Sequence, residues 1–143
     1  MYLDNVHVFD AYGTLFDVDH ACKEMANKIG NKWEKLSSLW RQKQLEYSWL
    51  YNSMNEYKSF WTITENSLDY SLKSAGIEAS YLRKELLSLY FRISAFKEVK
   101  GFLKSLNNKC IKTAILSNGS YDMLNSAVEN SGLSNLLSAV ISV

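Results

Sequence analysis

The sequence predicts an α/β fold in which a parallel sheet is interrupted by a long helical insertion. Short runs of β-branched and aromatic residues occur near the beginning and near the end of the 143-residue chain, and such runs are typical of strands. Between them, apolar residues recur at helical spacing from about residue 17 to residue 95. This stretch is too long for the crossover of a simple strand–helix–strand unit.

The first half of the chain is predicted to hold one strand and several helices. The strand covers residues 6–9 and ends at Asp10. A helix is expected to follow Asp19, which we interpret as its N-cap, and to run as far as Gly30. A longer helix is predicted over residues 32–54, with apolar stripes formed by Leu36, Leu39, Trp40, Leu45, Trp49 and Leu50. Further helices are predicted over residues 56–74, 79–90 and 96–106.

The last part of the chain returns to strand composition over residues 110–116, and Ser117-Asn118-Gly119-Ser120 is a strong turn signal. A helix over 121–130 and a strand over 139–143 complete a strand–helix–strand unit, which implies a parallel sheet. We therefore expect an α/β core made of residues 1–16 and 96–143. Residues 17–95 would form a helical cap over the carboxyl ends of the strands, where open α/β sheets bind ligands.

The composition excludes several classes of partner. Hydrophobic residues make up 47% and charged residues 22% of the chain, as in ordinary globular domains. A net charge of +1 gives no field that would attract nucleic acid or an anionic membrane. Residues 1–5 do not resemble a signal peptide, and no apolar run is long enough to cross a bilayer. Cys22 and Cys110 show no metal-ligand spacing, so we expect buried free thiols in a cytoplasmic protein.

Asp10 is the first candidate for chemistry, because it stands where a parallel strand ends. A carboxylate at that position faces the crevice, and Gly13 lets backbone amides approach a bound anion. An aspartate is ionised at pH 7 and can attack an electrophile without a separate base. From the local pattern alone, the alternative is an aspartate that closes an Asx turn or caps a helix.

Two segments resemble a known superfamily. Phe9-Asp10-Ala11-Tyr12-Gly13-Thr14-Leu15-Phe16-Asp17 resembles the first signature of the haloacid-dehalogenase (HAD) superfamily, and Leu116-Ser117-Asn118-Gly119 resembles the second. Phosphatases of the superfamily carry a second aspartate, a general acid, where this chain has Tyr12. A halide leaves as a stable anion and needs no proton, whereas the alkoxide of a phosphate ester benefits from one. The form with Tyr12 is similar to that of the (S)-2-haloacid dehalogenases, so the resemblance implies a HAD-like, Rossmann-like core with an inserted cap.

The resemblance also implies roles for individual residues. Asp10 would be the nucleophile and Thr14 would orient it, while Arg41 would bind a carboxylate or departing halide through its guanidinium. The substrate-binding set would be Ala11, Tyr12, Arg41, Ser117 and Asn118, and an apolar pocket would include Leu45 and Phe60. The structural alternatives are a solvated helix face for the arginine, local turns for the polar residues, and core packing for the apolar pair.

The activity implied by the resemblance is hydrolysis of short (S)-2-haloalkanoic acids to 2-hydroxy acids through an aspartyl ester. No metal or organic cofactor is expected, the partner is a small-molecule 2-haloacid, and a homodimer is a further expectation. The family normally continues past the strand that ends at Val143, with a lysine that neutralises the nucleophile. Lys112 does not replace it, because it lies inside an earlier strand. We therefore expect a truncated product with a core incomplete at its C-terminus, whose activity as it stands is in question.

Two alternatives stay open at this stage. One is a Mg²⁺-dependent phosphatase of the same superfamily, which Tyr12 argues against. The other is a non-catalytic remnant or binding module, which would be stabilised by ligands without releasing halide.

Overall fold

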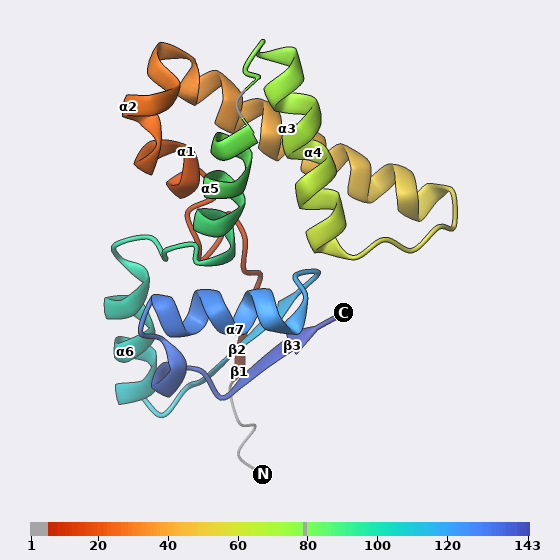
Figure 1. Ribbon diagram of the computed structural model, residues 1–143. Helices are drawn as coiled ribbons and strands as arrows, with labels where there is room; N and C mark the ends of the chain where they lie inside the picture. Colours follow the sequence, from red (N-terminus) through yellow and green to blue (C-terminus); the bar gives the residue numbers. More distant parts are fainter. Residues whose placement is uncertain (1–5, 79) are drawn as a thin grey trace. The chain divides into compact units, whose positions relative to one another are not determined.

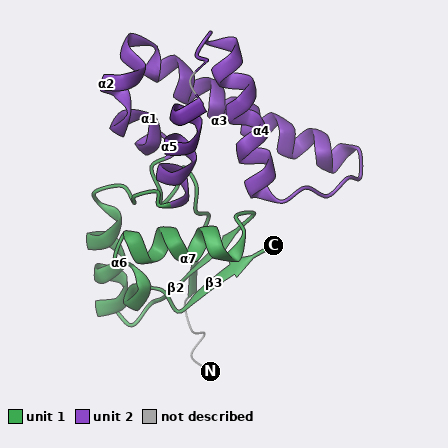
Figure 2. Cartoon of the chain, viewed as in Figure 1, with its two compact units in different colours: residues 1–17, 92–143 green, residues 18–91 purple. Residues whose placement is uncertain are grey.

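The computed structural model describes residues 6–78 and 80–143 and divides into two compact units (Figure 2). Unit 1 comprises residues 1–17 and 92–143, and unit 2 comprises residues 18–91. Residue 17 and residues 92–95, which we expected at the two ends of the insertion, lie in unit 1. Residues 1–5, and Ala79 at the expected start of a helix, lie outside the described residues.

Unit 1 contains a three-stranded parallel sheet, as the sequence predicted (Figure 1). Its strands are β1 (Val6–Phe9), β2 (Lys112–Ser117) and β3 (Ala139–Ser142), in the order β1-β2-β3. Phe9 pairs with Ile115, and Ser117 pairs with Ser142. Because the strands run in one direction, their carboxyl ends lie at the same edge of the sheet.

The helices of unit 1 are α6 (Val99–Asn108) and α7 (Tyr121–Asn130), and the short 3₁₀ helix η2 (Ser134–Leu136) precedes β3. The chain advances from β1 to β2 to β3 without reversing, so right-handed crossovers place α6 and α7 on the same face of the sheet. The core of this unit includes Leu103, Ile115, Met123, Leu124 and Leu133, all fully buried. On the opposite face, Val8, Leu116 and Ile141 are exposed.

Unit 2 consists of helices, in agreement with the expected insertion. They are α1 (His20–Glu24), α2 (Ala26–Ile29), the 3₁₀ helix η1 (Gly30–Lys32), α3 (Trp33–Ser53), α4 (Phe60–Ser74) and α5 (Ser80–Phe91). Helices α3 and α4 pack along one another, and α1 packs against both α3 and α5 (Figure 1). Leu36, Trp40, Leu68 and Leu86 form the centre of this core.

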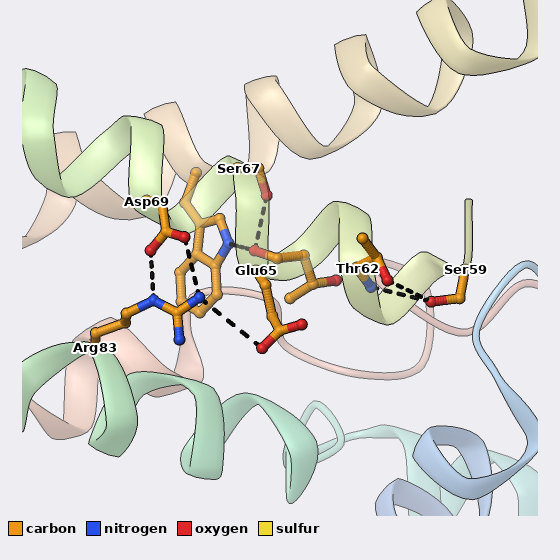
Figure 3. Close-up of polar contacts among 8 residues, drawn as sticks. Ser59, Thr62, Glu65, Ser67, Asp69 and Arg83 are labelled. Atoms are coloured by element: carbon orange, nitrogen blue, oxygen red, sulfur yellow. Dashed lines mark hydrogen bonds and ion pairs between the residues drawn. The ribbon is translucent and has the colours of Figure 1, made fainter. Parts of the chain in front are cut away.

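Helix boundaries in unit 2 differ from the prediction at two places. The helix expected from Asp19 to Gly30 is divided at Met25 into α1 and α2, and the Asp19 carboxylate makes no cap bond. It accepts a hydrogen bond of 2.6 Å from the Ser37 hydroxyl instead. Helix α4 begins at Phe60 rather than residue 56, because the Ser59 hydroxyl accepts from the Thr62 amide at 3.1 Å and caps the helix there (Figure 3).

Two residues of the predicted apolar stripes are exposed, and the expectation that both thiols are buried was wrong for one of them. Trp49 is 68% exposed and Leu50 is also exposed, and both lie near the C-terminal end of α3. Cys22 is buried, but Cys110 is exposed. Cys110 follows the C-cap of α6 with φ of 57°, the left-handed conformation that is common directly after a helix.

An ion-pair cluster joins α4 to α5 on the surface of unit 2. Figure 3 shows Arg83 of α5 facing Asp69 and Glu65 of α4. The Arg83 guanidinium contacts both carboxylate oxygens of Asp69, with Nη2 3.0 Å from Oδ2, and lies 3.9 Å from Glu65. These partly exposed pairs stabilise the helix pair modestly, since solvent screens them.

Candidate active site

Asp10 follows the last residue of β1, and a tight turn brings Thr14 against it. The carbonyl oxygen of Ala11 accepts from the amides of Thr14, Leu15 and Phe16 at 3.3, 2.9 and 3.0 Å, and Gly13 occupies the left-handed region with φ of 89°. The Thr14 hydroxyl donates to Asp10 Oδ2 at 3.3 Å. Both side chains are exposed, so a solute can reach the second carboxylate oxygen.

Tyr12 points into the core of unit 1. Its side chain is only 3% exposed, and its ring centroid lies 6.1 Å from that of Phe16. A Cβ atom on Gly119 would stand 2.7 Å from Tyr12 Cε2 and 3.1 Å from Leu124 Cδ2. Gly119 therefore lets the turn after β2 approach the turn after β1. The position two residues after Asp10 supplies a packed aromatic ring and no carboxylate.

Ser117 and Asn118 lie at the carboxyl end of β2, next to the end of β1. Ser117 is 6% exposed, and its Oγ accepts from the amide of Gly119 at 3.3 Å. Because Ser117 Oγ is the acceptor in this bond, its hydrogen can be donated to another group. The Asn118 side chain is exposed. Ala11 is fully buried in the neighbouring turn.

Ser142 was not among the residues selected from the sequence, although it holds this edge of the sheet together. Its hydroxyl donates to the carbonyl of Gly119 at 2.8 Å, and the amide of Val143 donates to the carbonyl of Ser117 at 3.1 Å. The end of β3 thus fixes the turn that carries Ser117 and Asn118. The sequence offered one signal for this role, a serine near the end of a predicted strand. That signal does not indicate which group the Ser142 hydroxyl contacts.

The remaining candidates belong to unit 2. Arg41 is partly buried on α3, and its Nη1 donates to Oε1 of Gln44 at 2.9 Å. The Nε2 of Gln44 donates to the Thr64 hydroxyl at 2.7 Å, and that hydroxyl donates to the carbonyl of Phe60 at 2.7 Å. Arg41 and Phe60 are thereby connected through two polar residues that sequence reasoning did not select. Leu45, beside Gln44 on α3, is partly exposed.

The structure therefore brings the candidates together in two groups, one in each unit. In unit 1, Asp10 contacts Thr14 directly, and Ser117 ends the neighbouring strand. In unit 2, Arg41 and Phe60 share one hydrogen-bonded network. Across residues 6–78 and 80–143, three or more His, Cys, Asp or Glu side chains nowhere gather as a metal site would require. The described helices are also too short or too polar to cross a membrane.

Comparison with known proteins shows which family the chain resembles. A family model described as haloacid dehalogenase-like hydrolase matches residues 5–143. An (S)-2-haloacid dehalogenase 1 from Pseudomonas sp. (strain CBS-3) is 46% identical over 137 residues, which cover 95% of this chain and 60% of that protein. The chain spans about 60% of the length of several such curated relatives.

Solved structures agree with this match. A crystal structure of a dehalogenase superposes with a TM-score of 0.93 at 40% identity, over 96% of this chain and 62% of the other. The L-2-haloacid dehalogenase from Xanthobacter autotrophicus with chloropropionic acid covalently bound superposes with a TM-score of 0.87 at 40% identity, over 99% and 57%. Because the family model matches almost the whole sequence, the chain belongs to the haloacid dehalogenase-like hydrolases.

Proposed function

We propose that the chain carries the nucleophile and the anion-binding residues of an (S)-2-haloacid dehalogenase. Asp10 is the nucleophile and Thr14 orients it, Ser117 and Asn118 bind the substrate carboxylate together with the backbone amides near Ala11 and Tyr12, and Arg41 binds the departing halide. The proposal is supported by the Thr14 bond to one oxygen of the exposed Asp10 carboxylate. It is supported equally by the similarity to dehalogenases over 95% of the chain.

The proposed reaction has two steps. In the first, an Asp10 carboxylate oxygen forms a bond to the α-carbon of a short 2-haloalkanoate. The carbon–halogen bond breaks, the halide leaves with the electron pair, and the centre is inverted. In the second, water adds to the carbonyl carbon of the ester and the acyl–oxygen bond breaks. This releases the 2-hydroxy acid, a proton and the free Asp10 carboxylate, so no metal or organic cofactor takes part.

Unit 2 acts in this proposal as the cap. Arg41 supplies a positive charge and a planar fork of hydrogen-bond donors for an anion. Leu45 and Phe60 form part of an apolar wall that excludes water from the reacting carbon, which strengthens the attraction between Arg41 and the halide. Leu45 is partly exposed, whereas Phe60 is buried.

The buried ring of Tyr12 separates this proposal from a phosphatase. A phosphoryl-transfer site would use a carboxylic acid at that position to protonate the leaving alkoxide. Tyr12 is packed against Gly119 and Phe16 instead. Halide departure needs no acid, so the packed ring is compatible with carbon–halogen cleavage.

Halide release from (S)-2-chloropropionate tests the proposal. We expect chloride release by the chain and its loss in Asp10→Asn, which keeps the shape of the carboxylate but not its nucleophilicity. Asp122→Asn is the matched control, because Asp122 is exposed in the first turn of α7. Circular dichroism establishes that all three proteins are folded.

The other outcomes discriminate the alternatives. Release that requires added Mg²⁺, or cleavage of p-nitrophenyl phosphate, would support the phosphatase. Thermal stabilisation by (S)-2-chloropropionate without chloride release would support a non-catalytic binding module. Equal chloride release by the native chain and by Asp10→Asn would disprove the role of Asp10.

We also propose that the protein forms a homodimer and is located in the cytoplasm. The exposed apolar side chains at the end of α3 and in the loop that follows are those a homodimer would cover: Trp49, Leu50, Met54 and Tyr57. Sedimentation velocity of the native chain and of Trp49→Lys tests this, with dissociation of the variant expected. The two free thiols agree with a reducing compartment.

A further inference from the structure

We propose that Gln44 is a positioning residue that holds the guanidinium of Arg41 in one orientation without neutralising it. The proposal rests on the anion-binding role of Arg41 proposed above. The hydrogen bonds of Gln44, from which it is argued, are independent of that role. Gln44 is 1% exposed and forms hydrogen bonds with three side chains of unit 2: Arg41, Thr64 and Tyr90. A fully buried amide with this many partners has very little rotational freedom.

The partners of Gln44 determine which way its amide faces. The Thr64 hydroxyl donates its hydrogen to the carbonyl of Phe60 at 2.7 Å, so its oxygen can only accept from Gln44 Nε2. The amide oxygen of Gln44 must then face the opposite side, where Arg41 Nη1 lies at 2.9 Å and the Tyr90 hydroxyl at 3.2 Å. Arginine has only donors, so the amide oxygen is the atom that Arg41 requires.

Neighbouring contacts make this arrangement rigid. The indole nitrogen of Trp40 donates to the carbonyl of Thr64 at 3.0 Å, and the Trp40 and Tyr90 rings are 4.9 Å apart. Helices α3, α4 and α5 each contribute at least one residue to the network around Gln44. Arg41 precedes Gln44 by three residues on α3, a spacing that puts both side chains on the same face of the helix.

A neutral amide suits an anion-binding arginine better than a carboxylate does. A glutamate at position 44 would form an ion pair with Arg41 and compete with any incoming anion for its charge. Glutamine orients one guanidinium nitrogen and adds no negative charge of its own. A bidentate guanidinium site depends on orientation as well as charge, so loss of the amide oxygen should weaken anion binding even though Arg41 remains.

The first test measures the mobility of Arg41 directly and does not depend on turnover. We expect ¹⁵N-arginine NMR of the full chain to show slow rotation about the Cζ–Nε bond of Arg41. This rotation should become several times faster in Gln44→Leu, which has similar volume but no acceptor, and remain slow in Gln44→Glu. Ser48→Ala is the control, because the Ser48 hydroxyl donates to the backbone carbonyl of Gln44 and not to its side chain. Equal rotation rates in Gln44→Leu and the native chain would overturn the proposal.

The second test separates a positioning role from a structural one. It measures binding of (S)-2-chloropropionate by calorimetry in the Asp10→Asn background, where no turnover occurs. We expect Arg41→Met and Gln44→Leu each to weaken binding about tenfold or more, and the double variant to bind no more weakly than Arg41→Met alone. Gln44→Glu should also weaken binding, although Arg41 stays immobile in this variant. The introduced carboxylate would form an ion pair with Arg41 and compete with the substrate anion.

The outcomes distinguish this proposal from the one on which it rests. If Arg41→Met binds as the parent does, the anion-binding role of Arg41 fails, while the NMR result still decides whether Gln44 orients it. If Arg41→Met weakens binding and Gln44→Leu does not, the positioning role alone fails. Additive losses in the double variant would show that Gln44 acts through the fold of unit 2 and not through Arg41, and would also overturn the proposal.

Discussion

The ring of Tyr12 lies so close to the backbone of Gly119 that no side chain fits between them. A Cβ atom on Gly119 would be 2.7 Å from Tyr12 Cε2, a distance that real Cβ atoms do not tolerate. The two signature segments of the sequence are thus joined by a direct contact, which fixes the turn after β2 against the turn after β1. The contact assigns Gly119 a packing role as well as a turn role.

Replacing Gly119 by alanine should therefore destabilise unit 1. We expect the free energy of unfolding to fall by about 1–3 kcal/mol, the usual cost of forcing an extra group into a packed site. Gly101→Ala is the control, since Gly101 lies within α6 and an added Cβ would come within 4 Å of no described atom outside the adjoining helix. That variant should gain about 0.5–1 kcal/mol from helix propensity. Urea unfolding measures both, and equal stability of the two variants would contradict the assigned contact.

Thr14 should affect catalysis more than stability. Thr14→Val removes the hydroxyl that donates to Asp10 Oδ2 at 3.3 Å and keeps nearly the same shape. Because the residue is exposed, the free energy of unfolding should change by less than about 0.5 kcal/mol. The rate of chloride release should fall about tenfold, as expected for a lost bond to a charged group, and Thr14→Ser should restore most of it. A Thr14→Val variant with the native rate would remove Thr14 from the proposed site.

The order of elements could be predicted because it depends on local periodicity. The strands, the helical insertion and the helix Tyr121–Asn130 all follow from apolar spacing and turn residues. The break at Met25 could not be predicted, since Ala21, Met25 and Ile29 keep helical spacing across it. The prediction that α4 starts at residue 56 was wrong, because the Ser59 side chain caps the helix through the amide of Thr62.

The candidate site was predictable only where it resembles signature segments. Asp10 follows one strand and Ser117 ends the next, so parallel pairing brings them to one edge. Gln44 has no such signal, because a glutamine on a predicted helix is usually solvated. Its role depends on which residues of α4 and α5 face α3, and periodicity within one helix does not specify the partner. The same holds for Gly119 and Ser142, whose contacts cross between segments.

Cys22 should make the stability of unit 2 fall at alkaline pH. Burial raises the pKa of the Cys22 thiol from its ordinary value of 9.0 to about 12, and a hydrogen bond with Ser37 opposes that shift. The unfolded thiol loses its proton above about pH 9 while the folded one keeps it, so the folded state binds more protons. The free energy of unfolding must then decrease between about pH 9 and pH 12, and the contribution is fully present below pH 9.

A matched variant isolates this effect from the lysines and tyrosines that titrate in the same range. Cys22→Ala should show a shallower loss of stability than the native chain between pH 9 and the highest pH at which unfolding is reversible. In the native chain, iodoacetamide should alkylate the exposed Cys110 and leave the buried Cys22 unmodified. Equal labelling of the two thiols, or identical pH profiles, would contradict a buried neutral Cys22.

The fate of the water oxygen distinguishes attack by Asp10 from direct attack by water. If Asp10 forms the ester and water adds to its carbonyl carbon, the oxygen of water enters the Asp10 carboxylate. A single turnover in H₂¹⁸O, with the chain in excess over (S)-2-chloropropionate, should therefore place ¹⁸O in the peptide that contains Asp10. The lactate released in that turnover should carry ¹⁶O, because its hydroxyl oxygen comes from the original carboxylate.

Repeated turnover provides the internal control for this experiment. After many cycles the Asp10 carboxylate has exchanged with solvent, so later lactate should carry ¹⁸O even though the first did not. Asp10→Asn should show neither lactate formation nor label, and Asp122→Asn should behave as the native chain. Label in the lactate of the first turnover would mean that water attacks the α-carbon directly. Asp10 would then act as a general base, and the ester would have to be withdrawn from the mechanism.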